Sequence, residues 1–441
     1  MKISIIAVGS RGDLQPYIAL GLGFKKSGHE VTIVAFQMYE SWVLETGLNF
    51  QGFQGDIKSW LNTPVGLDWL EAGANPLAFI KGLKILLSDF LEDLWIQSLD
   101  AASKSDLILF TPLGLTARHV AEAHNIPALP VFYVPHYPTR TFPSVLSPPS
   151  PFQFGWLNRV SHYGSEWALW HSCNNDIQRF RNQIGLPKFE YSKNKPFTEV
   201  TPYLMGYSEH VSPRAPDWPD HVQSTGYWFL DQSEGWTPPD DLQKFLSDGP
   251  APVYIGFGSM TGRKNKELTQ QILQGLASTG TRALLLTGWG ALTQDQLQGP
   301  WDPNQVFFLE NAPHDWLFPK MKAVVHHGGA GTTSSGFRAG TPQWVIPHFA
   351  DQFFWGERVH SLGCGPKPVS RKKVCVSDWI KNLTDLVENP NYRVNAHQLA
   401  EQIHSEDGVG QAVEIIERWY GSQSNAKPKG ELSTSLEFQD H

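Results

Sequence analysis

Cysteine, basic clusters and long apolar runs are scarce in this chain of 441 residues. The three cysteines, Cys173, Cys364 and Cys375, are widely spaced and lack a CxxC motif, which argues against a disulfide framework and against a zinc site. The formal net charge is -8 and no Lys/Arg cluster lies on a periodic face, so we expect no nucleic-acid partner. No window approaches the roughly 18 consecutive apolar residues of a membrane-spanning helix.

The apolar stretch in the opening MKISIIAVGS is also too short for the core of a secretion signal. We therefore expect a monomeric protein of the reducing cytoplasm. Aromatic residues are plentiful instead, with 17 Trp and 25 Phe. They fit a large aromatic core, a pocket for a lipophilic ligand, or a surface that touches a membrane.

The length exceeds what one hydrophobic core usually serves, which favours two domains with a cleft between them. Residues 231–252 combine turn residues with one short helical piece, a composition typical of a domain boundary. We predict a first domain over residues 1–235, a linker over 236–252, a second domain over 253–420 and a flexible polar tail over 421–441.

Short β-branched runs alternate with helical stretches in both halves, which predicts an α/β protein with two doubly wound sheets. In the first half the expected strands are residues 2–8, 29–36, 106–110 and 127–134, with helices over 16–26 and 116–125. In the second half the expected strands are residues 253–260, 283–287, 305–310, 323–327 and 343–347.

Two further segments of the first half carry apolar surface. Residues 139–156 are dense in Pro, Ser and Phe, which predicts a structured lid. Residues 83–99 have the pattern of an amphipathic helix, which packs on the core in most proteins and touches a membrane in some.

A glycine-rich turn offers the most specific signal. The strand at 323–327 ends in His326 and His327, the turn covers residues 328–331, and Thr332 and Thr333 open a helix. Glycines let backbone N–H groups approach phosphate oxygens, and the helix N-terminus adds its positive dipole end. The turn therefore predicts a diphosphate site.

Dinucleotide-binding enzymes use a similar loop, but theirs follows the first strand of its domain, whereas this loop follows a late strand. A second glycine pair, Gly21 and Gly23, lies within a helical run and is interpreted as a packing feature.

Four segments together resemble the nucleotide-sugar glycosyltransferases of the GT-B fold, in particular the sterol glucosyltransferases and bacterial enzymes of antibiotic pathways. These segments are GSRGDLQP at 9–16, GFGSM at 256–260, NAPHDWLFP at 311–319, and the stretch from HHGGAGTT to DQFFWGERV at 326–359. The resemblance implies two Rossmann-like domains facing across a cleft, a nucleotide sugar such as UDP-glucose as donor substrate, and no cofactor.

Carried over to this chain, the resemblance assigns the donor contacts. The diphosphate would lie among Ser259, His327, Gly329, Gly331 and Thr332. Asp351 and Gln352 would hold the sugar, and Ala312 and His314 would flank the base. Asn311 and Ser335 stand where plant relatives carry a base-stacking Trp and a ribose-binding Glu, so the resemblance leaves the base open between uracil and thymine or another base.

The family also implies a catalytic base in the first domain. Residues 12–16, GDLQP, resemble its G-H-x-x-P turn with Asp13 in place of histidine. Without the resemblance, an acidic residue in such a loop is more often a turn former or helix cap. As a base, Asp13 would take the proton of the acceptor hydroxyl while the diphosphate leaves from the opposite face, with inversion at the anomeric carbon.

The acceptor is expected to be a lipophilic alcohol such as a sterol, with Ser10 and His136 as contacts and with peripheral membrane contact allowed for. His29 and His326 are interpreted as structural. No paired acidic loop suggests a metal, because Asp240 and Asp241 follow Pro239 as a linker and helix cap. Polyketide, glycopeptide or carotenoid acceptors, an epimerase or hydrolase, and a non-catalytic nucleotide-sugar binder stay open.

Overall fold

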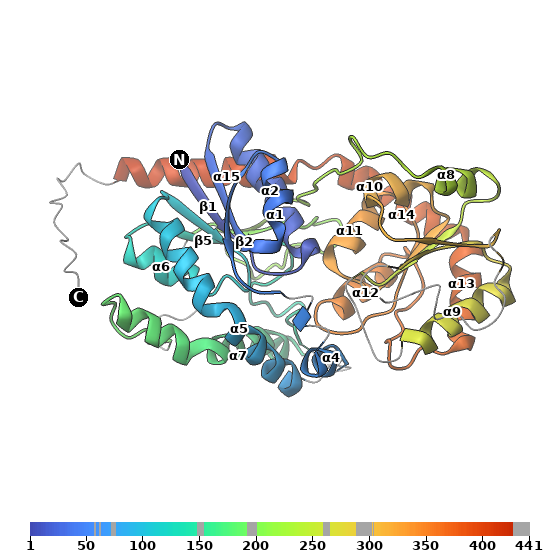
Figure 1. Ribbon diagram of the computed structural model, residues 1–441, viewed down its shortest axis with the longest axis horizontal. Coiled ribbons are helices and arrows are strands. Elements are labelled where there is room, and N and C mark those ends of the chain that lie inside the picture. The colour runs from blue at the N-terminus through green and yellow to red at the C-terminus, as the bar shows by residue number, and fades with distance from the viewer. Residues whose placement is uncertain are drawn as a thin grey trace.

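The chain folds into two α/β domains that lie side by side (Figure 1). The computed structural model describes residues 1–56, 59–60, 63–71, 76–147, 154–191, 201–258, 265–287, 302 and 304–426, and for residues 68–71, 76–80, 265 and 424–426 it describes the backbone alone. The predicted phosphate contact Ser259 and residues 427–441 of the predicted tail lie outside these ranges.

The first domain is built on a parallel sheet with the strand order β3-β2-β1-β4-β5-β6-β7. Its strands are β1 (Lys2–Ile6), β2 (Glu30–Phe36), β3 (Asn49–Phe53), β4 (Leu107–Phe110), β5 (Ala128–Phe132), β6 (Tyr203–Met205) and β7 (Val222–Ser224). The central strands are buried along their length, because helices cover both faces, which explains their continuous apolar sequence.

Two layers of helices cover this sheet (Figure 1). The helices of the first domain are α1 (Arg11–Lys26), the 3-10 turn η1 (Gln37–Tyr39), α2 (Glu40–Glu45), α4 (Pro64–Glu71), α5 (Pro76–Ser103), α6 (Ala117–Ala123) and α7 (Gly155–Gln183). Helix α5 packs against α6 and α7 and buries Leu87, Leu94 and Trp95, so the predicted amphipathic helix over residues 83–99 faces the core.

The second domain carries a parallel sheet with the order β10-β9-β8-β11-β12. Its strands are β8 (Val253–Gly256), β9 (Ala283–Leu286), β10 (Val306–Leu309), β11 (Ala323–His326) and β12 (Gln343–Val345). Its helices are α8 (Asp240–Ser247), α9 (Asn265–Thr279), α10 (His314–Leu317), the 3-10 turn η3 (Phe318–Lys320), α11 (Ala330–Arg338), α12 (Gln352–Ser361), α13 (Val376–Glu388) and α14 (Pro390–His404).

The last helix, α15 (Gly408–Ala426), returns to the first domain and packs on α1 (Figure 1). A Cβ on Gly23 would approach Val409 of α15 to 2.3 Å, so this glycine is needed for close helix packing, as predicted. His29 bonds Glu417 of α15 at 2.8 Å, which confirms its structural role. Gly421 to Ala426 are helical, so the helix continues six residues past the predicted start of the tail.

The observed elements differ from the predicted ones mainly at their ends. Helix α1 begins at Arg11 and contains Pro16, whereas the sequence suggested a start at Pro16. Proline is tolerated here because it lies close to the N-terminus, where it removes only one helical hydrogen bond. Helix α7 has no clear apolar stripe and was not predicted. The three cysteines are free, with Cys375 exposed.

Both sheets place a loop at the point where their strand order reverses. In the first sheet β1 lies between β2 and β4, and in the second β8 lies between β9 and β11. Ligands of doubly wound sheets bind outside the carboxyl ends of the strands at such points. The loop after β1 contains Ser10 and leads to Asp13, and the loop after β11 contains residues 327–329, so the topology brings the predicted site residues to both crevices.

Candidate active site

Asp13 occupies the first turn of α1 and is held on both carboxylate oxygens. Its Oδ2 accepts the backbone N–H of Ser10 at 2.6 Å and the Ser10 hydroxyl at 2.8 Å. Its Oδ1 accepts the hydroxyl of Tyr133. Since a carboxylate oxygen has two acceptor positions, Oδ1 retains capacity for one more hydrogen bond. The carboxylate is therefore both a helix cap and a group with a fixed orientation.

Gly9 makes room for this carboxylate. Its backbone has φ +155°, and a Cβ at this position would lie 2.5 Å from the Cβ of Asp13 and 2.6 Å from its Oδ2. Any other residue would push the Asp13 side chain away from Ser10. The glycine thus fixes where the carboxylate can lie.

The start of α1 lies directly against the start of α11. A Cβ built on Gly331 would lie 3.7 Å from the carbonyl oxygen of Gly12, and the two helices are in contact. Pro16 has no N–H to donate to that carbonyl, four residues earlier in the helix. The carboxylate loop of the first domain and the glycine-rich turn of the second therefore meet across the domain boundary.

The glycine-rich turn has the geometry expected of an anion site. Gly328 has φ +92°, and a Cβ there would lie 2.5 Å from Val345. Gly329 precedes the helix, and a Cβ there would lie 2.5 Å from Nε2 of His327. The first turn of α11 carries no acidic residue. Its N–H groups and positive dipole end are therefore available to an anion.

His326 supports this turn from behind. Its Nδ1 accepts the backbone N–H of Gly328 at 3.0 Å, so its Nε2 carries the proton and donates to the side-chain oxygen of Gln343 at 2.9 Å. Burial lowers the pKa of His326 to about 3, which keeps the ring neutral. The residue is structural, as predicted.

His327 and His314 lie close together beside the turn. Burial is the main reason that the pKa of each ring is lowered to about 4. His314 also contributes to the lowered pKa of His327, and the Arg11 cation contributes to the lowered pKa of His314. The Nδ1 of His327 is buried and has no hydrogen-bond partner among the described residues. His314 stacks on Phe318 at 4.2 Å, and Ala312 is buried nearby in the chain. Both rings are neutral at physiological pH.

Asp351 and Gln352 begin α12 on the far side of the turn. Burial raises the pKa of Asp351 to about 7, and the negative charge of Asp13 adds to this rise, while the indole of Trp355 donates to its Oδ2 at 3.0 Å. The side-chain oxygen of Gln352 accepts the N–H groups of His348 and Phe349 at 2.8 and 3.2 Å. The negative charge of Asp13, in the first domain, thus acts on Asp351 of the second.

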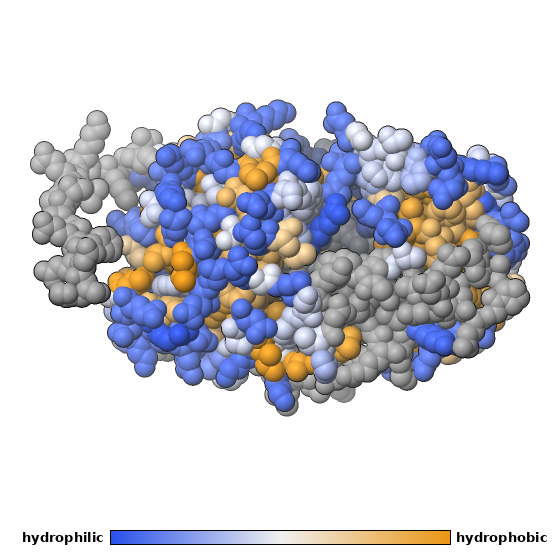
Figure 2. All heavy atoms as spheres, viewed as in Figure 1, coloured by the Kyte–Doolittle hydropathy of each residue, from blue (hydrophilic) through white to orange (hydrophobic). Residues whose placement is uncertain are grey.

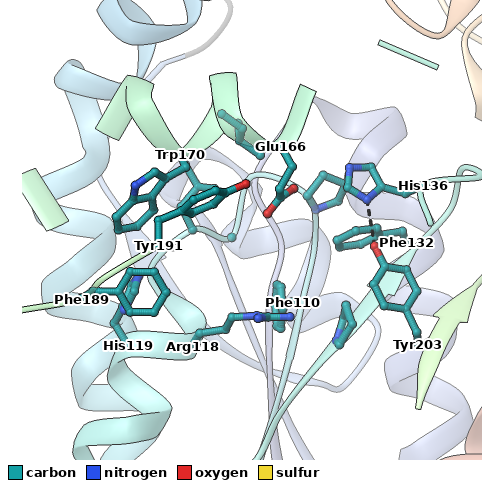
Figure 3. Close-up of a pocket in the computed structure, with 15 residues that line it drawn as sticks. Phe110, Arg118, His119, Phe132, His136, Glu166, Trp170, Phe189, Tyr191 and Tyr203 are labelled. Atoms are coloured by element: carbon teal, nitrogen blue, oxygen red, sulfur yellow. Dashed lines mark hydrogen bonds between the residues drawn. The ribbon is translucent and has the colours of Figure 1, made fainter. Parts of the chain in front are cut away.

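A cavity of about 90 Å³ lies in the first domain at the ends of β4 and β5. Figure 3 shows Glu166 and Arg118 among aromatic rings contributed by Phe110, Phe132, Trp170, Phe189, Tyr191 and Tyr203. The predicted acceptor contact His136 lines it as well, with its Nδ1 bonded to the Tyr203 hydroxyl at 2.8 Å. Burial lowers the pKa of His136 to about 3 and raises that of Glu166.

The cavity is adjacent to the carboxylate along the chain. Phe132 ends β5 and faces the cavity, and the next residue, Tyr133, donates to Asp13. The hydroxyl of Ser10, the other predicted acceptor contact, donates a hydrogen bond to Asp13. A lining residue of the cavity and a hydrogen-bond partner of the carboxylate are thus consecutive at the carboxyl end of β5.

The described residues contain neither a metal cluster nor a membrane-spanning helix. Within them, no group of three His, Cys, Asp or Glu side chains is placed to hold a metal ion. Of the helices described, none combines the length and apolar character needed to span a bilayer. Figure 2 shows hydrophilic and hydrophobic residues interspersed over the visible face of the first domain.

Several residues at the site escaped the sequence reasoning. Tyr133 lies near the end of the strand predicted over residues 127–134 and orients Asp13, and Trp355 orients Asp351 from one turn further along α12. Arg11 precedes the predicted base and places a cation near His314. The strand-end position of Tyr133 was the available signal, whereas the partner of Trp355 depends on the helix that begins at Gln352.

Two Asp→Asn variants should change stability with opposite signs. Asp351 has a raised pKa, so ionising it opposes folding as the pH rises from about 4 to 7. Asp351→Asn should stabilise the protein at pH 8, on the order of 1–2 kcal/mol after discounting for partial exposure, and have little effect near pH 4. Chemical denaturation at both pH values measures this, and an equal effect at both would contradict it.

Asp315 provides the matched control. Burial works to raise its pKa, but hydrogen bonds from Ser233 and Gln232 lower it overall. Its charge therefore stabilises the fold at neutral pH, and this contribution is lost as the pH falls through its folded-state pKa. Asp315→Asn should destabilise the protein at pH 8.

Comparisons with known proteins agree with this geometry. Residues 3–143 match the glycosyltransferase family 28 N-terminal domain, and residues 300–418 match the erythromycin biosynthesis protein CIII-like C-terminal domain. The sterol 3-beta-glucosyltransferases of Emericella nidulans and Aspergillus oryzae are 35% and 34% identical to the chain. Each alignment covers 95% of this chain but 30% of the relative, so the chain spans about a third of those proteins.

Among solved structures, the calicheamicin glycosyltransferase CalG4 superposes with a TM-score of 0.67 at 18% identity, covering 95% of this chain and 98% of that one. This likeness extends over both domains and the cleft between them, and it confirms the predicted fold. Together with the two family matches, it shows that the chain belongs to the glycosyltransferases of the GT-B fold.

Proposed function

We propose that the chain transfers glucose from UDP-glucose to the hydroxyl of a lipophilic alcohol such as a sterol, with inversion at the anomeric carbon. One observation carries the proposal most directly: the Asp13 carboxylate on one domain and the glycine-rich start of α11 on the other lie at abutting loops. A single sugar between them would have a base on one face and an anion site behind its leaving group.

Asp13 serves as the general base in this proposal. Ser10 and Tyr133 hold the carboxylate in place, and the remaining acceptor position of Oδ1 takes the proton of the attacking hydroxyl as the new bond forms. A carboxylate is too weak to deprotonate an alcohol beforehand, so fixed orientation matters more than basicity. Gly9 and the two hydrogen-bond donors supply that orientation.

The leaving diphosphate is stabilised by fixed dipoles. The N–H groups at the start of α11, including those of Gly331 and Thr332, point toward developing negative charge, as in other helix N-terminal anion sites. His327 is neutral and donates one ring N–H. Asp351 and Gln352 hold the sugar hydroxyls, and Ala312 and His314 flank the base. We also propose that transfer needs no metal.

The acceptor class rests on the cavity of the first domain and on the relatives. Its lining is largely aromatic, which suits a flat apolar molecule, and the polar side chains of Arg118, His136 and Glu166 are set among those rings. The curated relatives are named as sterol 3-beta-glucosyltransferases. The cavity, of about 90 Å³, is partly open and would take one end of a sterol.

Incubation with radiolabelled UDP-glucose and a mixture of sterols, with and without a chelator, tests the function. Label should pass into an organic extract in both samples. Free labelled glucose would indicate a hydrolase, and binding of UDP-glucose without turnover would indicate a binding protein. Loss of transfer on chelation would contradict the metal-free mechanism.

Asp13→Asn tests the base. The variant keeps the hydrogen bonds of the carbonyl oxygen but cannot take the proton, so the rate of transfer should fall by about 10²- to 10⁴-fold. The affinity for UDP, measured by calorimetry, should stay within a few-fold of the wild type. Asp240→Asn, at the exposed start of α8, is the matched control and should leave the rate unchanged.

Gly329→Ala tests the diphosphate site. The new Cβ would lie 2.5 Å from Nε2 of His327 and must displace that ring. The affinity for UDP should fall about tenfold or more, a loss of at least about 1.4 kcal/mol. Gly164→Ala in α7, where nothing lies within 4 Å, should leave UDP binding unchanged. Equal affinities for the two variants would show that the diphosphate does not bind beside His327.

A further inference from the structure

Helix α7 carries an exposed aromatic face along its first half. Trp156 is 64% exposed, Val160 56%, Tyr163 40% and Trp167 52%, and Phe154 just before the helix is 56% exposed. The four helical positions are spaced i, i+4, i+7 and i+11, so they lie on one side of the helix. Large apolar side chains gathered in this way on a protein surface mark an interaction site.

We propose that this face, formed by Phe154, Trp156, Val160, Tyr163 and Trp167 and called the α7 aromatic face below, docks on the surface of a lipid bilayer. Trp and Tyr are the residues that favour the boundary between headgroups and acyl chains, because their rings are apolar and their N–H or O–H groups remain hydrated. A face that inserts shallowly, with the helix lying in the plane of the interface, fits this composition.

The charges around the face fit the same partner. Arg159 is exposed on α7, and Arg140 is exposed beside Gly155, where an added Cβ would lie 3.2 Å from the Arg140 Cβ. From residue 154 to residue 175 the sole carboxylate is Glu166, which lines the internal cavity. The exposed Asp217 adjoins this end, where the Arg140 N–H donates to it at 2.9 Å and the charge of Arg159 helps to lower its pKa.

The second half of α7 has a different character. Asp176 and Arg179 lie there, and Arg179 reaches Glu92 of α5 at 3.5 Å. An acidic, ion-paired surface is costly to bring against anionic headgroups, so the bilayer contact is confined to the first half of the helix. The polarity change along one helix therefore defines both the position of the contact and its limit.

The cavity adjoins the same helical segment. Glu166, Leu169 and Trp170 of α7 line it, and they lie on the flank of the helix next to the side that carries Tyr163 and Trp167. Figure 3 shows Glu166 and Trp170 at the cavity. Docking on the α7 aromatic face would hold the cavity within one helix diameter, about 10 Å, of the bilayer surface. A lipophilic acceptor dissolved in the bilayer would then have a short path to the site, although bilayer binding itself does not require any transfer activity.

Co-sedimentation with phosphatidylcholine vesicles, with and without phosphatidylserine, tests the proposal. The double variant Trp156→Ser/Trp167→Ser should bind vesicles at least about tenfold more weakly than the wild type, because two large apolar side chains no longer insert. Ile96→Ser/Val394→Ser, which removes two apolar residues of similar exposure elsewhere, should bind like the wild type. Calorimetric UDP binding shows whether each variant is folded.

Two further measurements separate the outcomes. Arg159→Glu should weaken binding to vesicles that contain phosphatidylserine more than binding to phosphatidylcholine alone. Tryptophan fluorescence of the wild type should be quenched by brominated lipid, and this quenching should be lost in the double variant. Equal sedimentation of the wild type and the double variant would overturn the proposal.

The remaining outcomes are also decisive. If the double variant changes the oligomeric state in analytical ultracentrifugation and leaves vesicle binding intact, the face joins two copies of the chain and the proposal is wrong. Transfer to a detergent-solubilised acceptor should be the same in the double variant and the wild type. Failure of vesicle binding by the wild type with intact transfer would therefore reject the docking surface without affecting the proposed function.

Discussion

The approach of two helix N-termini across the domain boundary is the constraint on which the site depends. Each terminus presents unsatisfied N–H groups and a positive dipole end, and two such ends repel unless negative charge lies between them. Helix α1 carries its own counter-charge, because Asp13 caps its first turn. Helix α11 has no acidic residue in its first turn, so it lacks such a charge from its own sequence. This asymmetry explains why an anion would bind at α11 while the carboxylate stays at α1.

Enclosure sets the protonation of the groups around this contact. Burial keeps His314, His326, His327 and His348 neutral, with pKa values of about 4 or 3. A neutral imidazole ring can donate one N–H hydrogen bond but carries no full charge. A diphosphate bound beside these rings would therefore interact with N–H dipoles and not with cations. The same enclosure raises the pKa of Asp351 to about 7, and the negative charge of Asp13 contributes to that rise. A ligand hydroxyl that donates to Asp351 would favour its ionised form.

The sequence was sufficient for the fold class, because alternating strands and helices and glycine-rich turns leave local signals. The roles predicted for the site residues stay predictions. Most of the predicted strands were correct to within one or two residues, but the strand predicted over 253–260 ends at Gly256, and β3, β6 and β7 were not predicted. The turn at 328–331 appeared where its glycines indicated. Contacts that depend on tertiary packing left no such signal. The residues near Asp13 in the sequence do not indicate that Tyr133, 120 residues away, donates a hydrogen bond to it. Helix α7 was missed because its exposed positions are apolar, which erases the amphipathic pattern.

The crossing of α15 back to the first domain adds a second connection between the domains. The chain passes between the domains at residues 231–239 and again before α15, which is bound to α1 by the packing of Val409 on Gly23 and by the bond from Glu417 to His29. The two domains are therefore joined at two places along the chain. Asp315 bonds the backbone of Gln232 and Ser233, and Arg338 of α11 pairs with Asp231, so the first crossing is fixed to the second domain. A relative movement of the domains would leave the cap of α1 undisturbed, since Ser10, Asp13 and Tyr133 all belong to the first domain.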